Sequence, residues 1–60
     1  MMKFKKACAD LQEKIYDFIE EKYEIEGEVD FDEVQAFAKT LQIEITYDEI
    51  QSYCWELDEY

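Results

Sequence analysis

The sequence predicts a mainly α fold, a small three-helix bundle that forms one acidic domain over residues 1–60. Apolar residues recur at spacings of three and four, which is the period of an amphipathic helix. The chain has no proline and only one glycine, although β-hairpin turns rely on residues of this kind. It is 48% hydrophobic and 17% aromatic, whereas disordered acidic chains are poor in aromatic residues. Together these observations favour a folded helical chain.

The first helix is expected over about residues 3–24, and Gly27 ends this region. Its apolar stripe consists of Phe4, Ala7, Cys8, Leu11, Ile15, Phe18, Ile19 and Tyr23. Lys3, Lys5 and Lys6 would lie at the positive end of the helix dipole, which is unfavourable for cations. Either these lysines serve something other than helix stability, or the first turn frays.

The second helix is expected over about residues 30–42 and the third over about residues 46–58. Each begins with a capping-box pattern, in which two residues three apart satisfy each other's backbone amides. The two boxes are Asp30 with Glu33 and Thr46 with Glu49. Residues 25–29 and 43–45 alternate apolar and acidic side chains, so they could pair as a minimal two-stranded ribbon. Residues 25–29 could equally form an extended connection.

The ten aromatic residues are more than a core of this size needs. Four of them fit the apolar stripes and are predicted to be core residues: Phe4, Phe18, Phe31 and Phe37. Tyr53 fits the stripe of the third helix, and the remaining five lie at stripe edges or off them: Tyr16, Tyr23, Tyr47, Trp55 and Tyr60. Tyrosine and tryptophan among acidic residues are typical of surfaces that anchor protein interfaces. A tyrosine at a helix edge with a solvated hydroxyl is the plainer interpretation.

The chain carries seventeen acidic residues against six lysines, a formal net charge of −11. Such a charge repels free nucleic acid and anionic membrane surfaces, because both bind proteins through basic groups. A basic protein surface is therefore the expected partner. The densest acidic run supplies the candidate partner-binding residues, with Trp55 as an aromatic anchor. These candidates are Glu20, Glu21, Glu24, Glu26, Glu28, Asp30, Asp32, Glu33 and Trp55.

Catalysis is poorly supported, because the chain has no histidine, no arginine and one serine, Ser52. No catalytic residue, metal ligand or cofactor is assigned. Cys8 and Cys54 lack metal-type spacing and are predicted to be small core residues with free thiols. A disulfide between them is the alternative. No secretory signal and no apolar run of membrane-spanning length is recognised, so a cytoplasmic protein is expected.

Two function classes follow from this profile. Small, acidic, arginine-free helical proteins resemble phage or mobile-element inhibitors of host machinery. In such a protein, carboxylates would stand in for the phosphates of a nucleic acid and block a DNA- or RNA-binding protein. The alternative is a structural or assembly subunit, a helical homo-oligomer whose acidic face is only solvated. A domain of 60 residues is marginal by itself, so self-association would add stability.

The chain around Gly27 also resembles a degenerate EF-hand loop. With Gly27 at the sixth position, Glu24 and Glu26 fall at positions three and five and Glu33 falls at position twelve. Lys22 departs from the pattern, because it stands at position one, where the motif has an aspartate ligand. The resemblance implies calcium binding as a third, minor hypothesis.

Overall fold

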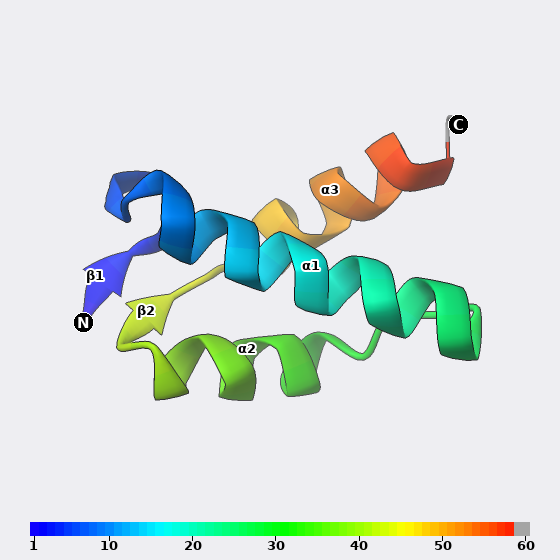
Figure 1. Ribbon diagram of the computed structural model, residues 1–60, viewed down its shortest axis with the longest axis horizontal. Coiled ribbons are helices and arrows are strands. Elements are labelled where there is room, and N and C mark those ends of the chain that lie inside the picture. Colours follow the sequence, from blue (N-terminus) through cyan, green and yellow to red (C-terminus); the bar gives the residue numbers. More distant parts are fainter. Residues whose placement is uncertain (59–60) are drawn as a thin grey trace.

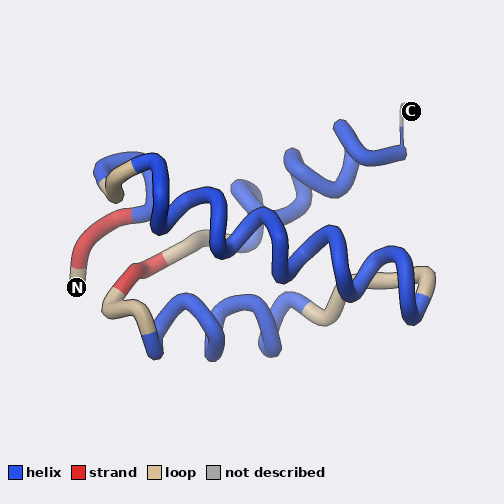
Figure 2. Tube along the Cα trace, in the orientation of Figure 1, coloured by secondary structure: helices blue, strands red, loops and turns tan. Residues whose placement is uncertain are grey.

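A computed structural model describes residues 1–58 and confirms a mainly α fold with three helices. The first two helices flank the connection 27–30 and run antiparallel beside each other, while the last helix runs in the direction of the first (Figure 1). The two short strands lie together at the end of the molecule where the first helix begins (Figure 2). In chain order the elements are β1 (Met2–Lys3), the 3-10 helix η1 (Phe4–Lys6), α1 (Ala9–Glu26), α2 (Phe31–Thr40), β2 (Ile43–Glu44) and α3 (Tyr47–Asp58).

The first helix begins at Ala9, so the prediction that it begins near residue 3 is wrong. Cys8 is extended, with φ −67° and ψ 161°, and separates η1 from α1. The side chain of Gln12 donates a hydrogen bond of 2.9 Å to the carbonyl oxygen of Phe4, which fixes η1 against α1. The three lysines near the N-terminus therefore do not occupy the first turn of α1, where the helix dipole would oppose them.

The ribbon exists, but its first strand is β1 and not residues 25–29. β1 and β2 pair in parallel, with Met2 opposite Ile43, and the Met2 amide donates to the Gln42 carbonyl at 3.1 Å. The antiparallel helix pair explains this choice, because it places the end of α2 beside the start of α1 (Figure 1). Residues 25–29 lie at the other end, where Ile25 still belongs to α1.

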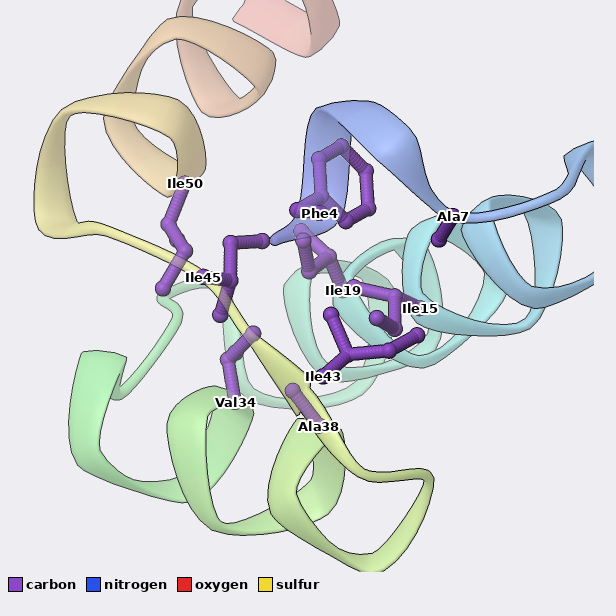
Figure 3. Packing of buried hydrophobic residues seen from close by; sticks show 9 residues of the cluster. All are labelled: Phe4, Ala7, Ile15, Ile19, Val34, Ala38, Ile43, Ile45 and Ile50. Carbon is purple, nitrogen blue, oxygen red and sulfur yellow. The ribbon is translucent and has the colours of Figure 1, made fainter. Parts of the chain in front are cut away.

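The core is rich in isoleucine (Figure 3). Ile15 and Ile19 of α1 face Val34 and Ala38 of α2, and all four side chains are fully buried. The other buried residues are Phe4, Ala7, Ile43, Ile45 and Ile50. β2 and the residue after it thus contribute two buried isoleucines, Ile43 and Ile45, to the core between the helices.

Aromatic pairs pack between the helices at the edge of this core. Phe18 and Phe37 stack between α1 and α2 with ring centroids 4.4 Å apart. Tyr16 and Tyr53 stack between α1 and α3 at 4.1 Å. Phe4 is buried as predicted, whereas Phe18, Phe31 and Phe37 are only partly buried and pack against the core from its edge. The rings therefore shield the isoleucines from water rather than forming the centre themselves.

The predicted helix ends are confirmed where they rest on caps. Thr46 and Glu49 form the reciprocal capping box at α3, since each side chain accepts a hydrogen bond from the other's amide at 3.1–3.2 Å. The Asp30 side chain accepts from the Asp32 amide at the start of α2. Gly27 ends α1 in the left-handed region with φ 75°, a conformation that is costly for residues with a Cβ atom.

The cysteines are both free thiols, as predicted, but Cys8 is exposed, so the prediction that it is a core residue is wrong. Cys54 is partly buried, and burial raises the pKa of its thiol. The sequence pattern misplaced Cys8 because it assumed one continuous helix through residues 3–24.

Two matched substitutions test the core. Ile19→Val should lower the free energy of unfolding by about 1 kcal/mol, because it removes a methyl group from a fully packed position. Ile25→Val should change it by less than about 0.5 kcal/mol, because the Ile25 side chain is 73% exposed. Urea denaturation followed by circular dichroism measures both. Equal losses in the two variants would contradict the described packing of α1.

Candidate functional site

The eight acidic residues of the segment 20–33 lie along the last turns of α1, the connection 27–30 and the first turn of α2. We call this segment the acidic end. The end of α1 and the start of α2 lie beside each other, opposite the end that carries β1 (Figure 1). The antiparallel packing of the two helices thus gathers into one region charges that the sequence spreads over fourteen positions.

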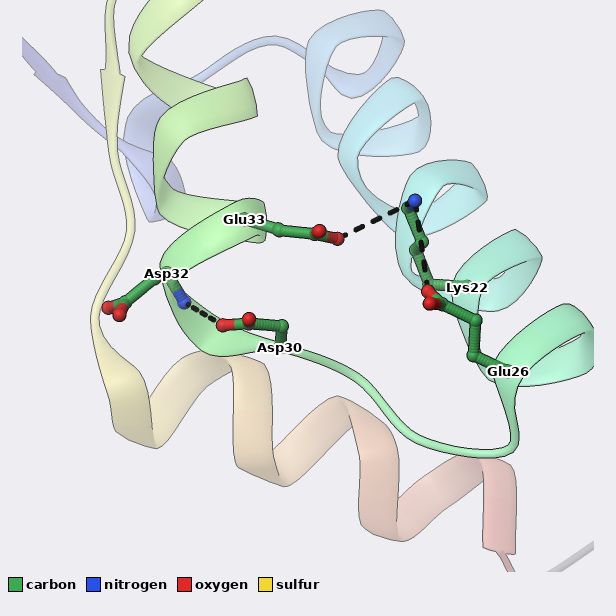
Figure 4. A network of polar contacts seen from close by, with 5 residues as sticks. All are labelled: Lys22, Glu26, Asp30, Asp32 and Glu33. Atoms are coloured by element: carbon green, nitrogen blue, oxygen red, sulfur yellow. Dashed lines mark hydrogen bonds and ion pairs between the residues drawn. The ribbon is translucent and has the colours of Figure 1, made fainter.

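Lys22 is the one cation of the acidic end. Its ammonium nitrogen lies 3.8 Å from a Glu26 oxygen and 3.5 Å from a Glu33 oxygen, so it links α1 to α2 (Figure 4). It also lies 5.6 Å from the centre of the Phe18 ring, a cation–π distance. Exposed ion pairs contribute only about 0–1 kcal/mol each. Eight acidic residues and one lysine still leave seven uncompensated negative charges.

Four of the eight carboxylates have partners inside the protein. Glu26 and Glu33 contact Lys22, Asp30 caps α2, and Glu20 accepts a hydrogen bond from α3. Because Glu33 pairs with Lys22, it does not complete the predicted capping box with Asp30. The other four are exposed and make no hydrogen bond or ion pair within residues 1–58: Glu21, Glu24, Glu28 and Asp32. The Asp32 carboxylate points away from the contacts around Lys22 (Figure 4).

Trp55 belongs to α3 and is 62% exposed. Its position off the apolar stripe of this helix predicted such exposure. Tyr47 on the same helix is also exposed, but its ring packs on Phe31 with centroids 4.2 Å apart. The indole of Trp55 is therefore the largest aromatic surface that α3 presents to solvent.

Two tyrosine–carboxylate hydrogen bonds connect α1 to α3, and sequence reasoning missed both. The Tyr53 hydroxyl donates to Glu20 Oε1 at 2.8 Å, and the Tyr23 hydroxyl donates to Asp58 Oδ1. The partners are 33 and 35 residues apart, so no local spacing signals them. Beside them a groove of about 350 Å³ is lined by Glu20, Tyr23, Glu24 and Leu57.

These contacts favour the neutral form of the phenols. Burial, followed by the hydrogen bond to Glu20, raises the pKa of Tyr53 far above its ordinary value of 10.0. The hydrogen bond to Asp58 raises the pKa of Tyr23, and burial with the nearby charges of Glu56 and Glu49 raises the pKa of Tyr16. The seam between α1 and α3 therefore depends on protonated tyrosines.

The exposed lysines Lys3, Lys5 and Lys6 line a second groove, of about 410 Å³, together with Thr46, Asp48 and Glu49 of the α3 start. This places them against the negative first turn of α3. The three lysines thus share a groove with acidic residues of another helix.

The EF-hand loop of the minor hypothesis does not form around Gly27. α1 remains helical through Glu26, so Glu24 and Glu26 lie within a helix and not in a loop. The connection that remains is residues 27–30, much shorter than the twelve-residue loop of the motif. Within residues 1–58, no three acidic or cysteine side chains converge as a metal site would require.

No protein family, curated protein or solved structure gives a significant match to this chain. None of the helices within residues 1–58 combines the length and apolar character needed to cross a bilayer.

Alkaline unfolding tests the tyrosine contacts. Because the folded state holds the Tyr53 proton more tightly than the unfolded chain, its contribution to stability is full below pH 10.0 and is lost as the pH rises above that value. Tyr53→Phe should cost about 1 kcal/mol at neutral pH, since it removes the hydrogen bond to Glu20. It should also reduce the alkaline loss. Urea unfolding between pH 7 and 11 measures both effects.

Tyr47→Phe is the matched control, because the exposed Tyr47 hydroxyl makes no hydrogen bond within residues 1–58. It should change the free energy of unfolding by less than about 0.5 kcal/mol. An alkaline loss that is as steep in Tyr53→Phe as in the native protein would show that this contact does not carry the effect.

Proposed function

We propose that this protein is a binding module whose acidic end occupies a basic surface of another protein. The observation that carries the proposal is the group of seven uncompensated charges at one end of the fold, four of whose carboxylates have no internal partner within residues 1–58. Such a surface attracts a basic partner over distances of about a Debye length and speeds its association. In its most specific form the module is a nucleic-acid mimic that inhibits a DNA- or RNA-binding protein.

The arrangement of charge supports use rather than mere solubility. A net charge of about 2 to 8 suffices for a small soluble domain, and this chain carries −11. Glu24 and Glu26 lie at the C-terminal end of α1, where the helix dipole disfavours negative charge. The helix dipole would favour a basic residue in the last turn of α1, where it would offset these glutamates, but that turn contains none. The protein thus tolerates charges that weaken its own fold.

An assembly role is the second candidate, favoured by an apolar groove at the opposite end. This groove, about 630 Å³ in volume, includes the exposed side chains of Met1 and Met2, with Leu11, Leu41 and Ile43. Sedimentation equilibrium over a range of protein concentrations tests this role. A monomer at all concentrations would remove it.

The partner can be sought by immobilising the protein, passing bacterial lysate over it, and eluting first with salt and then with duplex DNA. The expected result is a nucleic-acid-binding protein that both treatments release. Its binding should weaken by about 2 kcal/mol, or about 30-fold in Kd, when four carboxylates without internal partners are neutralised, at about 0.5 kcal/mol each. These changes are Glu21→Gln, Glu24→Gln, Glu28→Gln and Asp32→Asn.

The matched control neutralises four exposed acidic residues outside the acidic end: Glu13→Gln, Asp17→Asn, Glu44→Gln and Glu56→Gln. The net charge changes equally in both variants, so a difference between them reports the position of the charge. Equal weakening would show that only net charge matters. A column that captures no basic protein would overturn the proposal for abundant bacterial targets.

Lys22→Gln should act in the opposite direction. It adds one uncompensated negative charge and releases Glu26 and Glu33 from Lys22, so the partner should bind about twofold to fivefold more tightly at low salt. The free energy of unfolding of this variant should fall by up to about 1 kcal/mol, because the ion pair that links α1 to α2 is lost. Titration calorimetry at two salt concentrations measures the affinity. Weaker binding would contradict an electrostatic role for the acidic end.

A further inference from the structure

We infer that the groove between α1 and α3 receives an arginine side chain of the basic partner. This inference rests on the proposed function and names one contact within it. The groove is lined by Glu20, Tyr23, Glu24 and Leu57, so it combines two carboxylates, an aromatic ring and an aliphatic wall. Its volume of about 350 Å³ lies at the low end of ligand pockets, which suits one side chain rather than a large ligand.

The two carboxylates are placed for a forked cation. Glu20 and Glu24 are four residues apart on α1 and so lie on one face of the helix, a turn apart. Glu20 accepts the Tyr53 hydrogen bond through Oε1, which leaves Oε2 as an acceptor. Glu24 is exposed and makes no hydrogen bond or ion pair within residues 1–58. A planar guanidinium carries five donors and can bond both carboxylates at once.

The walls of the groove suit the rest of an arginine side chain. The Tyr23 hydroxyl is engaged with Asp58, which anchors the phenol and leaves its ring to the groove. An arginine stacks on such a ring by cation–π attraction, while its methylene groups pack on Leu57. None of the four lining residues is a lysine, so the groove contains no cation of its own. Lys22, the nearest lysine in sequence, contacts Glu26 and Glu33 instead.

The inference is tested by nuclear magnetic resonance with the full-length, ¹⁵N-labelled chain. The probe is N-acetyl-arginine amide, and its uncharged isostere N-acetyl-citrulline amide is the control ligand. The arginine probe should shift the amides of Glu20, Tyr23, Glu24 and Leu57 with a saturable Kd of about 1 mM, the affinity expected for a ligand of this size. The citrulline probe should not shift them.

Glu24→Gln should weaken the arginine probe about tenfold, because it removes one charged acceptor from the groove. The matched variant Glu13→Gln makes the same change at an exposed position of α1 outside the groove and should leave the Kd unchanged within about twofold. Small, non-saturating shifts across the protein, equal shifts with citrulline, or equal effects of the two variants would overturn the inference. N-acetyl-lysine amide binding as tightly as arginine would overturn the choice of arginine.

Failure of this inference is distinguishable from failure of the proposed function. One outcome is a salt-sensitive protein partner that binds Glu24→Gln and Glu13→Gln with the same affinity. That result would retain the acidic end as the binding surface and reject the groove as an arginine site. A lysate that yields no basic partner overturns the proposed function for abundant bacterial targets, whatever the probe titration gives.

Discussion

The fold depends on the burial of five isoleucines against a charge that opposes compaction. Ile15, Ile19, Ile43, Ile45 and Ile50 form most of the core of a chain that carries a net charge of −11. Self-repulsion weakens a compact state, and a domain of this size buries only about 60% of its unfolded surface. The free energy of unfolding is therefore expected to be small, so that the contacts between each pair of helices matter for stability. The aromatic pairs serve this need, because they extend the shielded apolar region beyond the nine side chains that are buried within residues 1–58.

The same packing that forms the core also concentrates the charge. Because α1 and α2 run antiparallel, the core contacts of Ile19 with α2 bring the end of α1 beside the start of α2. At the start of α2, Asp30 and Asp32 are favoured by the helix dipole and a cap. At the end of α1, the glutamates are disfavoured by the dipole, and Lys22 offsets only part of this cost. The acidic end is thus partly a product of good capping and partly a burden on the fold.

The helices could be predicted because they rest on local signals. The period of the apolar residues and the capping pair Thr46–Glu49 fixed α3 almost to the residue, from an expected range of 46–58 to the observed Tyr47–Asp58. The start of α1 could not be read in this way. The spacing of Phe4, Ala7 and Leu11 fits a helix, yet Phe4 and Ala7 are buried from a 3-10 turn and an extended residue. The 3-10 turn is held by contacts that no helical spacing signals, the pairing of Met2 with Ile43 and the hydrogen bond from Gln12 to the Phe4 carbonyl oxygen.

The candidate site likewise has features that local sequence signals predict and features that depend on long-range contacts. The acidic run and the exposure of Trp55 are visible in the sequence, because charge density and stripe position are local properties. Which carboxylates remain available is not visible, since the partners of Glu20 and Glu33 lie on other helices. The groove beside Tyr23 depends on the approach of α3 to α1 and has no sequence signature at all.

The two proposed roles need not compete for the same surface. The apolar groove around Met2 lies at the end that carries β1 and the three lysines, and the acidic end lies opposite (Figure 1). A second copy seated at the apolar groove would leave the acidic carboxylates in solvent. Added salt should change the affinities of the two contacts in opposite directions. It screens the attraction of a basic partner, and it also screens the repulsion between two copies of charge −11. Binding of a basic protein should weaken as salt rises, whereas self-association should strengthen, so one salt series on one preparation assigns each contact to its cause.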